Sequence, residues 1–318
     1  MMNIIKKAEN LPVGAIATAV GLATLSNVFA AALGMQSVRH VTMFLTSFVW
    51  FAAVIKIIVY RKAFLSDYSN VVPASLYATV TMLTMILGNY IFSFHEGIGR
   101  VIWLVGVVIH AIHILIFTYR NIIKGVKLDT FVPSWFVTFV AFLVSGVVGA
   151  DKGMPTLMTG FIIYGLIIYA IIFPCMVIKV AKVGILPQFE LTRTIFLAPT
   201  SLVFVTLLNA VENPPHWLVF TLYGILFLTI LYMTTKIPKF LATPFNPGHG
   251  ALTFPTAIAL VATFRMGGFL INNGYAQLGQ WVNHLFGIQL WVTTAIMAYV
   301  AFNFMKIFVN SLKPAPQK

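Results

Sequence analysis

The sequence predicts an all-α integral membrane protein, with ten transmembrane helices arranged as five helical hairpins around a central pore and the odd-numbered helices inside. Three observations lead to this prediction: the composition, a succession of apolar segments and a repeated proline. Of the 318 residues, 60% are hydrophobic and 8% are charged, and the mean hydropathy is +0.95. The 27 charged side chains (20 basic and 7 acidic) are too few to cover a soluble protein of this size, so most of the surface must face lipid.

Ten apolar segments are each about as long as the ~20 residues that a helix needs to cross a bilayer. The first follows Lys6 and Lys7, as the apolar part of a signal peptide does, but from Leu11 to Leu33 it is longer than that part usually is. We therefore expect it to stay as the first helix of a single domain, residues 1–318. The expected helices cover about 11–34, 38–60, 74–94, 98–119, 132–150, 155–178, 195–211, 215–235, 250–272 and 284–306.

Basic residues distinguish the two sides of the predicted bundle. Sixteen of the 20 Lys and Arg residues lie near the termini or in the linkers after the second, fourth, sixth and eighth helices. The exceptions are Arg39, Arg100 and Lys152 on the other side, and Arg265 within the ninth helix. Because basic residues favour the cytoplasmic side, both termini are expected in the cytoplasm, which an even number of helices allows.

A proline recurs at or near the start of each odd-numbered helix. Successive spacings of these prolines are 61, 60, 66 and 56 residues, which predicts one helical hairpin used five times in the same orientation. The alternative is that proline simply favours the first turn of a helix, but the last two lie several residues inside their apolar segments. The five are Pro12, Pro73, Pro133, Pro199 and Pro255.

The odd-numbered helices are suited to an inner ring. The first is rich in small residues between Gly14 and Gly21, which allow close approach of helices, and the third and ninth carry several threonines. The even-numbered helices carry bulkier apolar runs such as 166–173, which suit contact with lipid.

Several function classes are disfavoured by what the sequence contains. The net charge of +13 is spread in ones and twos between apolar segments, so we expect no nucleic-acid partner. Cys175 is the only cysteine, expected to be a buried and inert thiol, and none of the seven acids falls in the middle of a span. No nucleotide-binding loop, catalytic triad or metal cluster is present in the sequence, so we expect no enzyme and no cofactor.

Three short stretches, in their order and placement, resemble the tellurite-resistance/dicarboxylate transporter family, which includes the slow anion channel of plant guard cells and bacterial relatives. They lie at the first helix, before the seventh and at the start of the ninth. The stretches are Leu11-Pro12-Val13-Gly14 with Gly21-Leu22-Ala23-Thr24-Leu25, then Leu186-Pro187-Gln188-Phe189 with Phe196-Leu197-Ala198-Pro199, and Thr253-Phe254-Pro255.

This resemblance implies anion passage through five hairpins around a pore, a trimer of independently conducting protomers and a place in the bacterial inner membrane. It also implies that Phe254, in the Phe-Pro stretch, occludes the pore. An apolar ring in a narrow, dehydrated tube raises a barrier to any ion, and Pro255 loosens the local backbone hydrogen bonds. The alternative is ordinary packing, because the chain has 28 phenylalanines.

Arg265 is the basic residue placed within a predicted span, where charges usually face a water-filled path or the interior of a bundle. It follows Phe254 by eleven residues, or three helical turns, so both face nearly the same way about 16 Å apart along the helix. The hypothesis is that it attracts anions; the alternatives are snorkelling to the interface or pairing with an acid.

Further candidate residues lie on odd-numbered helices and on the fourth helix. The expected pore-lining residues on odd-numbered helices are Gly14, Thr18, Thr138, Pro199 and Thr256. His110 and His113 share one face of the fourth helix, a spacing compatible with a metal or a proton relay, but packed, hydrogen-bonded histidines are the favoured interpretation.

The predicted function is an anion channel or channel-like exporter for small anions such as chloride and nitrate. One alternative is a carrier for C4-dicarboxylates such as malate, with or without proton coupling. Another is a non-conducting membrane scaffold or sensor. Resistance to tellurite follows only from the resemblance.

Overall fold

The computed structural model describes residues 7–312, and within this range the chain forms helices and turns without a β-strand. Lys6, Lys313 and Lys318, which contribute to the charge asymmetry, lie outside the described residues. The principal helices are α2 (Val13–Leu33), α3 (Gln36–Ile58), α4 (Arg61–Ser69), α5 (Val71–Leu76), α6 (Ala78–Phe92), α7 (Glu96–Thr118), α8 (Trp135–Phe139), α9 (Val144–Val147), α10 (Pro155–Lys182), α11 (Leu197–Ala210), α12 (His216–Leu241), α13 (Thr253–Asn272) and α14 (Ala276–Leu312). Short 3₁₀ segments include η4 (Ala141–Leu143), η5 (Ala150–Lys152), η6 (Pro187–Phe196) and η7 (Pro247–Leu252).

Nine helical segments among the described residues are long and apolar enough to cross a membrane. They correspond to nine of the ten expected helices, with α5 and α6 forming one span, η6 and α11 another, and η7 and α13 a third. The continuous helix expected over 132–150 is not observed, because α8, η4 and α9 divide that segment. The apolar helical part, Trp135–Val147, is about 20 Å long at 1.5 Å per residue, which is short of the ~30 Å bilayer core.

The break between α8 and α9 is stabilised by side chains from neighbouring helices, which bond the carbonyl groups that a continuous helix would use internally. His110 Nε2 lies 2.9 Å from the carbonyl oxygen of Thr138. In a continuous helix, this oxygen would accept a hydrogen bond from the backbone N–H four residues later. Because lipid offers no hydrogen bonds, an irregular backbone is tolerated only when protein groups satisfy it. The other donors are Tyr164 to Phe139, Thr206 to Leu143, Trp103 to Ser145, and Asn209 to Gly146 and Val147.

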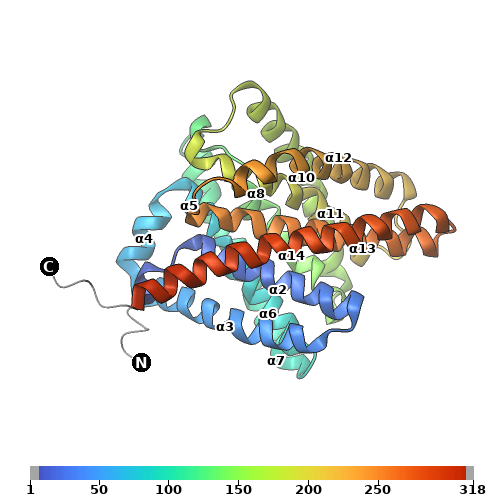
Figure 1. The fold of residues 1–318 in the computed structure, drawn as a ribbon, viewed down its shortest axis with the longest axis horizontal. Helices are drawn as coiled ribbons and strands as arrows, with labels where there is room; N and C mark the ends of the chain where they lie inside the picture. The colour runs from blue at the N-terminus through green and yellow to red at the C-terminus, as the bar shows by residue number, and fades with distance from the viewer. Residues whose placement is uncertain (1–6, 313–318) are drawn as a thin grey trace.

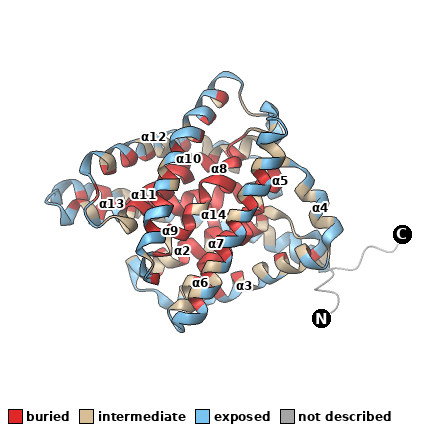
Figure 2. Ribbon diagram, turned by 180° about the vertical axis from the view of Figure 1, so that it is seen from behind, coloured by how far each residue is buried: buried red, intermediate tan, exposed pale blue. Residues whose placement is uncertain are grey.

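The long helices fall into two classes by burial. In the spans of α2, α5–α6, η6–α11 and η7–α13, 67–83% of the most apolar stretch is buried, against 22–33% in α3, α7, α10, α12 and α14. Figure 2 shows the buried residues concentrated on the central segments and the exposed residues on the surrounding ones. Apolar side chains on the outer helices are therefore exposed in large numbers, which is typical of surfaces that face lipid.

The buried segments contact one another in a closed cycle. α2 packs against α6, α6 against α9, α9 against α11, α11 against α13, and α13 again against α2. Outer helices α3, α7, α12 and α14 pack beside the inner helix that each follows in the chain, whereas α10 packs mainly on α11, which comes after it. The described chain begins and ends at one end of the molecule, which we call the terminal end (Figure 1). We call the opposite end the distal end.

Four of the side-chain hydrogen bonds that join adjacent inner segments share a sequence separation of 63 residues. Thr138 Oγ1 donates to Ser75 O, Lys152 Nζ to Asn89 Oδ1, Thr206 Oγ1 to Leu143 O and Asn209 Nδ2 to Gly146 O. This separation lies within the 56–66 residue spacing of the five prolines.

Two distal turns depend on glycine. Gly34 after α2 has φ +69° and Gly274 after α13 has φ +86°, both in the left-handed region that glycine adopts without a steric penalty. Beyond Gly34, the N–H of Met35 returns to the Phe29 carbonyl at 3.1 Å, which closes the end of α2.

Cys175 is exposed on α10, so the expectation of a buried thiol is wrong. In a membrane protein, an apolar sequence context indicates contact with lipid as readily as burial in protein.

Candidate functional site

Two cavities lie inside the cycle of buried segments. The first, here the small cavity, has a volume of about 20 Å³, enough for roughly one water molecule. Residues from all five inner segments line it, and their side chains are almost entirely apolar. They are Ala17, Leu76, Thr79, Phe136, Val137, Ala141, Ile195, Ala198, Gly250, Ala251, Phe254 and Pro255.

The second, here the distal cavity, has a volume of about 360 Å³ and a mixed lining. Its apolar side chains come mainly from α2, α6, α9 and α13, and its polar ones come from the distal halves of α2, α6 and α13 and from the start of α3. The polar residues are Thr24, Asn27, Gln36, Arg39, Asn89 and Arg265.

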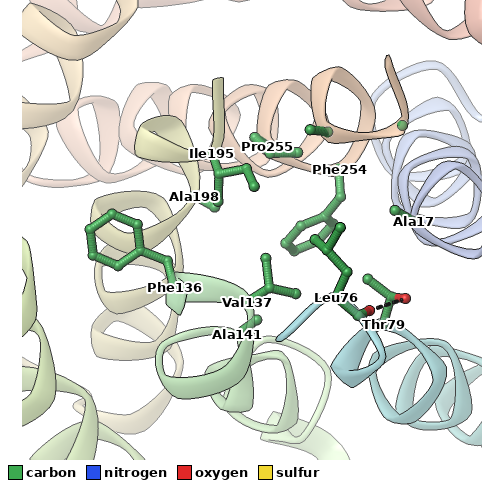
Figure 3. Close-up of a pocket in the computed structure, with 12 residues that line it drawn as sticks. Ala17, Leu76, Thr79, Phe136, Val137, Ala141, Ile195, Ala198, Phe254 and Pro255 are labelled. Carbon is green, nitrogen blue, oxygen red and sulfur yellow. Dashed lines mark hydrogen bonds between the residues drawn. The ribbon is translucent and has the colours of Figure 1, made fainter. Parts of the chain in front are cut away.

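Phe254 is the residue of the described chain that lines both cavities. Its side chain is 5% exposed. Figure 3 shows the ring projecting from the start of α13 toward Leu76 and Val137, across the space between the inner segments. The ring therefore separates an apolar constriction from a larger, polar compartment.

The start of α13 is held against α2 by close packing and by a hydrogen bond. Thr253 Oγ1 lies 3.2 Å from the Ala17 carbonyl and 2.7 Å from that of Gly250. A Cβ at Gly21 would lie 2.7 Å from Thr253 Cβ and 2.8 Å from the backbone nitrogen of Phe254. Since such contacts are shorter than non-bonded atoms tolerate, the close approach of α2 to the backbone that carries the Phe254 ring requires glycine at position 21.

Arg265 and Arg39 both face the distal cavity, and neither forms an ion pair within the described residues. Arg265 Nη2 donates to Asn209 Oδ1 at 2.7 Å, and Arg39 Nε donates to Asn27 Oδ1 at 2.9 Å. The sequence predicts a role at the site for Arg265, but for Arg39 only a position on one side of the membrane. The missed signal is that Arg39 and Asn27 flank the first distal turn, which brings them together.

No Asp or Glu is among the residues that line the distal cavity, so its charge is positive. Lys152 lies behind the lining: it is fully buried, donates to Asn89 Oδ1 at 2.6 Å and pairs with Asp151. Burial lowers the pKa of Lys152 from its ordinary value, an effect that Asp151 opposes and that Arg100 reinforces.

The other predicted pore-lining residues are buried but line neither cavity. Gly14 packs tightly against η7, where a Cβ would meet the Pro247 carbonyl. The hydroxyls of Thr18 and Thr256 bond carbonyls of their own helices, Thr138 bonds Ser75, and Pro199 lies within α11. Their assignment to a conduction path stays a prediction.

His110 and His113 are packed and hydrogen-bonded, as the favoured interpretation expected. Besides Thr138, His110 Nδ1 contacts Thr81 Oγ1 at 2.8 Å, and His113 contacts Tyr68 OH at 2.8 Å and Thr138 Oγ1 at 3.3 Å. Among residues 7–312, no group of three or more His, Cys, Asp or Glu side chains is arranged to hold a metal ion.

Comparison with protein families matches residues 10–305 to the family described as voltage-dependent anion channel, SLAC1. Comparison with curated protein sequences gives no match.

Proposed function

Because the chain belongs to the SLAC1 family of voltage-dependent anion channels, we propose that it conducts small anions such as chloride and nitrate through a path closed by Phe254. Members of this family are channels and transporters in membranes, and this chain is a multi-pass membrane protein. The proposed path runs between α2, α6, α8–α9, α11 and α13, whose closed cycle of contacts encloses both cavities.

The observation that carries the proposal is the position of Phe254 between the small cavity and the distal cavity. An ion in the apolar constriction would lose its water and gain no polar partner, so the ring and its neighbours form a barrier. Moving or shortening one side chain would connect the two cavities.

The second part of the proposal concerns the sign of the permeant ion. Arg39 and Arg265 contribute two guanidinium groups to the distal cavity, and no carboxylate lines it. In a cavity with low-dielectric walls, this charge raises the local concentration of anions and lowers that of cations.

We also propose the bacterial inner membrane as the location, with the terminal end in the cytoplasm, and a homotrimer as the assembly. The excess of basic residues at the terminal end and the broad apolar surface of α3, α7, α10 and α14 support these assignments. Native mass spectrometry of the detergent-solubilised protein tests the trimer directly.

The test of the function compares wild type, Phe254→Ala and the control Phe269→Ala, a half-buried residue of the same helix that lines neither cavity. Currents are recorded in chloride, nitrate and malate on the same membranes. Large currents in chloride and nitrate from Phe254→Ala alone are the expected result.

Other outcomes assign the alternatives. Saturable malate uptake by wild type, without current in either variant, would identify a dicarboxylate carrier. Absence of any flux from all three proteins would contradict transport and leave the scaffold or sensor.

A further inference from the structure

Three asparagines near the distal end share one arrangement: a basic side chain donates to the carboxamide oxygen. Arg39 bonds Asn27 at 2.9 Å, Lys152 bonds Asn89 at 2.6 Å and Arg265 bonds Asn209 at 2.7 Å. Arginine and lysine have no hydrogen-bond acceptor, so the atom that each contacts must be the oxygen. The orientation of each carboxamide is therefore fixed by chemistry, with its NH₂ group on the side away from the basic residue.

The free NH₂ groups differ in where they lie. Asn209 Nδ2 donates to the carbonyls of Gly146 and Val147, at 3.1 and 2.9 Å, and Asn209 does not line the distal cavity. Asn27 and Asn89 do line it, and the Nδ2 of neither donates to a protein acceptor within residues 7–312. Two unpartnered amide donors are thus left in a cavity of about 360 Å³.

We propose that Asn27 and Asn89, together with Arg39 and Arg265, form a binding site for planar oxyanions such as nitrate or a carboxylate, and that Lys152 is a positioning residue for Asn89. This inference rests on the proposed anion path and identifies the site within it that discriminates ions. A guanidinium group presents paired donors that match two oxygens of one anion, and each amide NH₂ group adds a neutral N–H donor beside it.

Selection against cations follows from the same arrangement. A carboxamide offers both a donor and an acceptor, and its oxygen would coordinate a potassium or sodium ion if it faced the cavity. Here the oxygens of Asn27 and Asn89 are occupied by Arg39 and Lys152, so the asparagines present donors.

Lys152 acts on the cavity from outside it. Its ammonium group is buried, lies 3.7 Å from the centre of the Phe92 ring and is paired with Asp151. Without this ammonium group, the Asn89 carboxamide is free to rotate and to present its oxygen to the cavity.

The selectivity test uses Phe254→Ala as the conducting background and measures reversal potentials under a potassium nitrate gradient. Asn89→Asp and Asn27→Asp replace the donor by an acceptor of the same shape, and the expected result is a decrease of about tenfold in the nitrate-to-potassium permeability ratio. The matched control is Asn273→Asp, which adds the same charge at an exposed distal position that does not line the cavity. Equal shifts from Asn89→Asp and Asn273→Asp would overturn the site.

If Lys152 positions Asn89, the effect of substituting Lys152 depends on which residue is present at position 89. Lys152→Met is expected to lower the nitrate-to-potassium permeability ratio when Asn89 is present and to have no further effect in the Asn89→Leu variant. Lys152→Arg, which keeps the positive charge, is expected to retain the original ratio. Independent, additive effects of Lys152→Met and Asn89→Leu would contradict it.

A binding measurement separates failure of the site from failure of the channel. Nitrate is expected to raise the thermal unfolding midpoint of purified wild type and of Asn273→Leu, but not of Asn89→Leu or Asn27→Leu. If Phe254→Ala carries no current but nitrate stabilises only the wild type and Asn273→Leu, the channel is contradicted and the binding site is supported. The same nitrate stabilisation in all four proteins would reject the site.

Discussion

At the scale of single residues, the charge of the distal cavity comes from guanidinium groups that are bonded to amides and not to acids. Arg265 and Arg39 each donate one hydrogen bond to an asparagine oxygen. Because asparagine is neutral, this bond does not cancel the charge of the guanidinium group. A carboxylate partner would have cancelled that charge. The arrangement stabilises the arginines and leaves the potential of the cavity positive.

Arg265→Ala, in the Phe254→Ala background, is expected to lower chloride conductance by about tenfold at low salt and by less at high salt, because ions screen the lost charge. Arg100→Ala is the control, since it removes the same charge from the distal side without altering a residue that lines the cavity. Equal conductance in the Arg265→Ala and Arg100→Ala proteins at low salt would contradict the attraction.

At the scale of elements, the divided segment between α8 and α9 depends on donors from its neighbours. Tyr164 OH donates to the Phe139 carbonyl at 2.8 Å, and three further side chains, those of Thr206, Trp103 and Asn209, donate to later carbonyls of the segment. Its hydrophobicity is that of a spanning helix, and Pro133 marks a start like those of the other repeats. The break could not be predicted from this segment alone, because the donors that permit it lie on other helices.

Tyr164→Phe is therefore expected to lower the free energy of unfolding by about 1–3 kcal/mol, because it leaves the Phe139 carbonyl without its partner. Thermal unfolding in detergent measures the change. Tyr275→Phe removes a hydroxyl from an exposed tyrosine and is expected to have no effect; equal destabilisation by both substitutions would refute the role of Tyr164.

The contact of α2 with the start of α13 gives a second prediction at this scale. Gly21→Ala places a methyl group 2.8 Å from the Phe254 nitrogen, so the two helices must move apart, at a cost of about 1–3 kcal/mol. Gly224→Ala on α12 adds a methyl group to open space and is expected to be neutral or slightly stabilising, since alanine favours helix over glycine. Thermal unfolding of both variants checks the contrast, and similar midpoints would argue against close packing at Gly21.

For the whole molecule, the core is apolar as in a soluble protein, but the exposed outer helices also carry many large apolar side chains. Composition and the succession of apolar segments therefore predict an all-helical membrane protein and the nine long spans of the described residues, because length and hydropathy are properties of single segments. Phe254 and Arg265 could be placed on one cavity from their eleven-residue spacing. Arg39, Asn27 and Asn89 could not, because their pairing with each other and with Lys152 depends on the contact of segments distant in the chain.

Labelling the exposed Cys175 can test whether the outer surface of α10 contacts lipid. A nitroxide spin label on this single cysteine of the reconstituted protein is expected to collide readily with dissolved oxygen and little with a polar nickel complex, because exposed apolar side chains on α10 favour contact with lipid. Relaxation measurements by electron paramagnetic resonance give both accessibilities. Higher accessibility to the nickel complex would place α10 in water.

Single-channel conductance across the series Phe254→Leu, Phe254→Val and Phe254→Ala shows whether the ring of Phe254 closes the path. If the ring closes the path between the small cavity and the distal cavity, conductance of chloride rises at each step as the side chain shortens, and wild type stays closed. Conductance that is independent of the size of residue 254, or absent from all three variants when the proteins are folded and reconstituted, would contradict a path closed at Phe254.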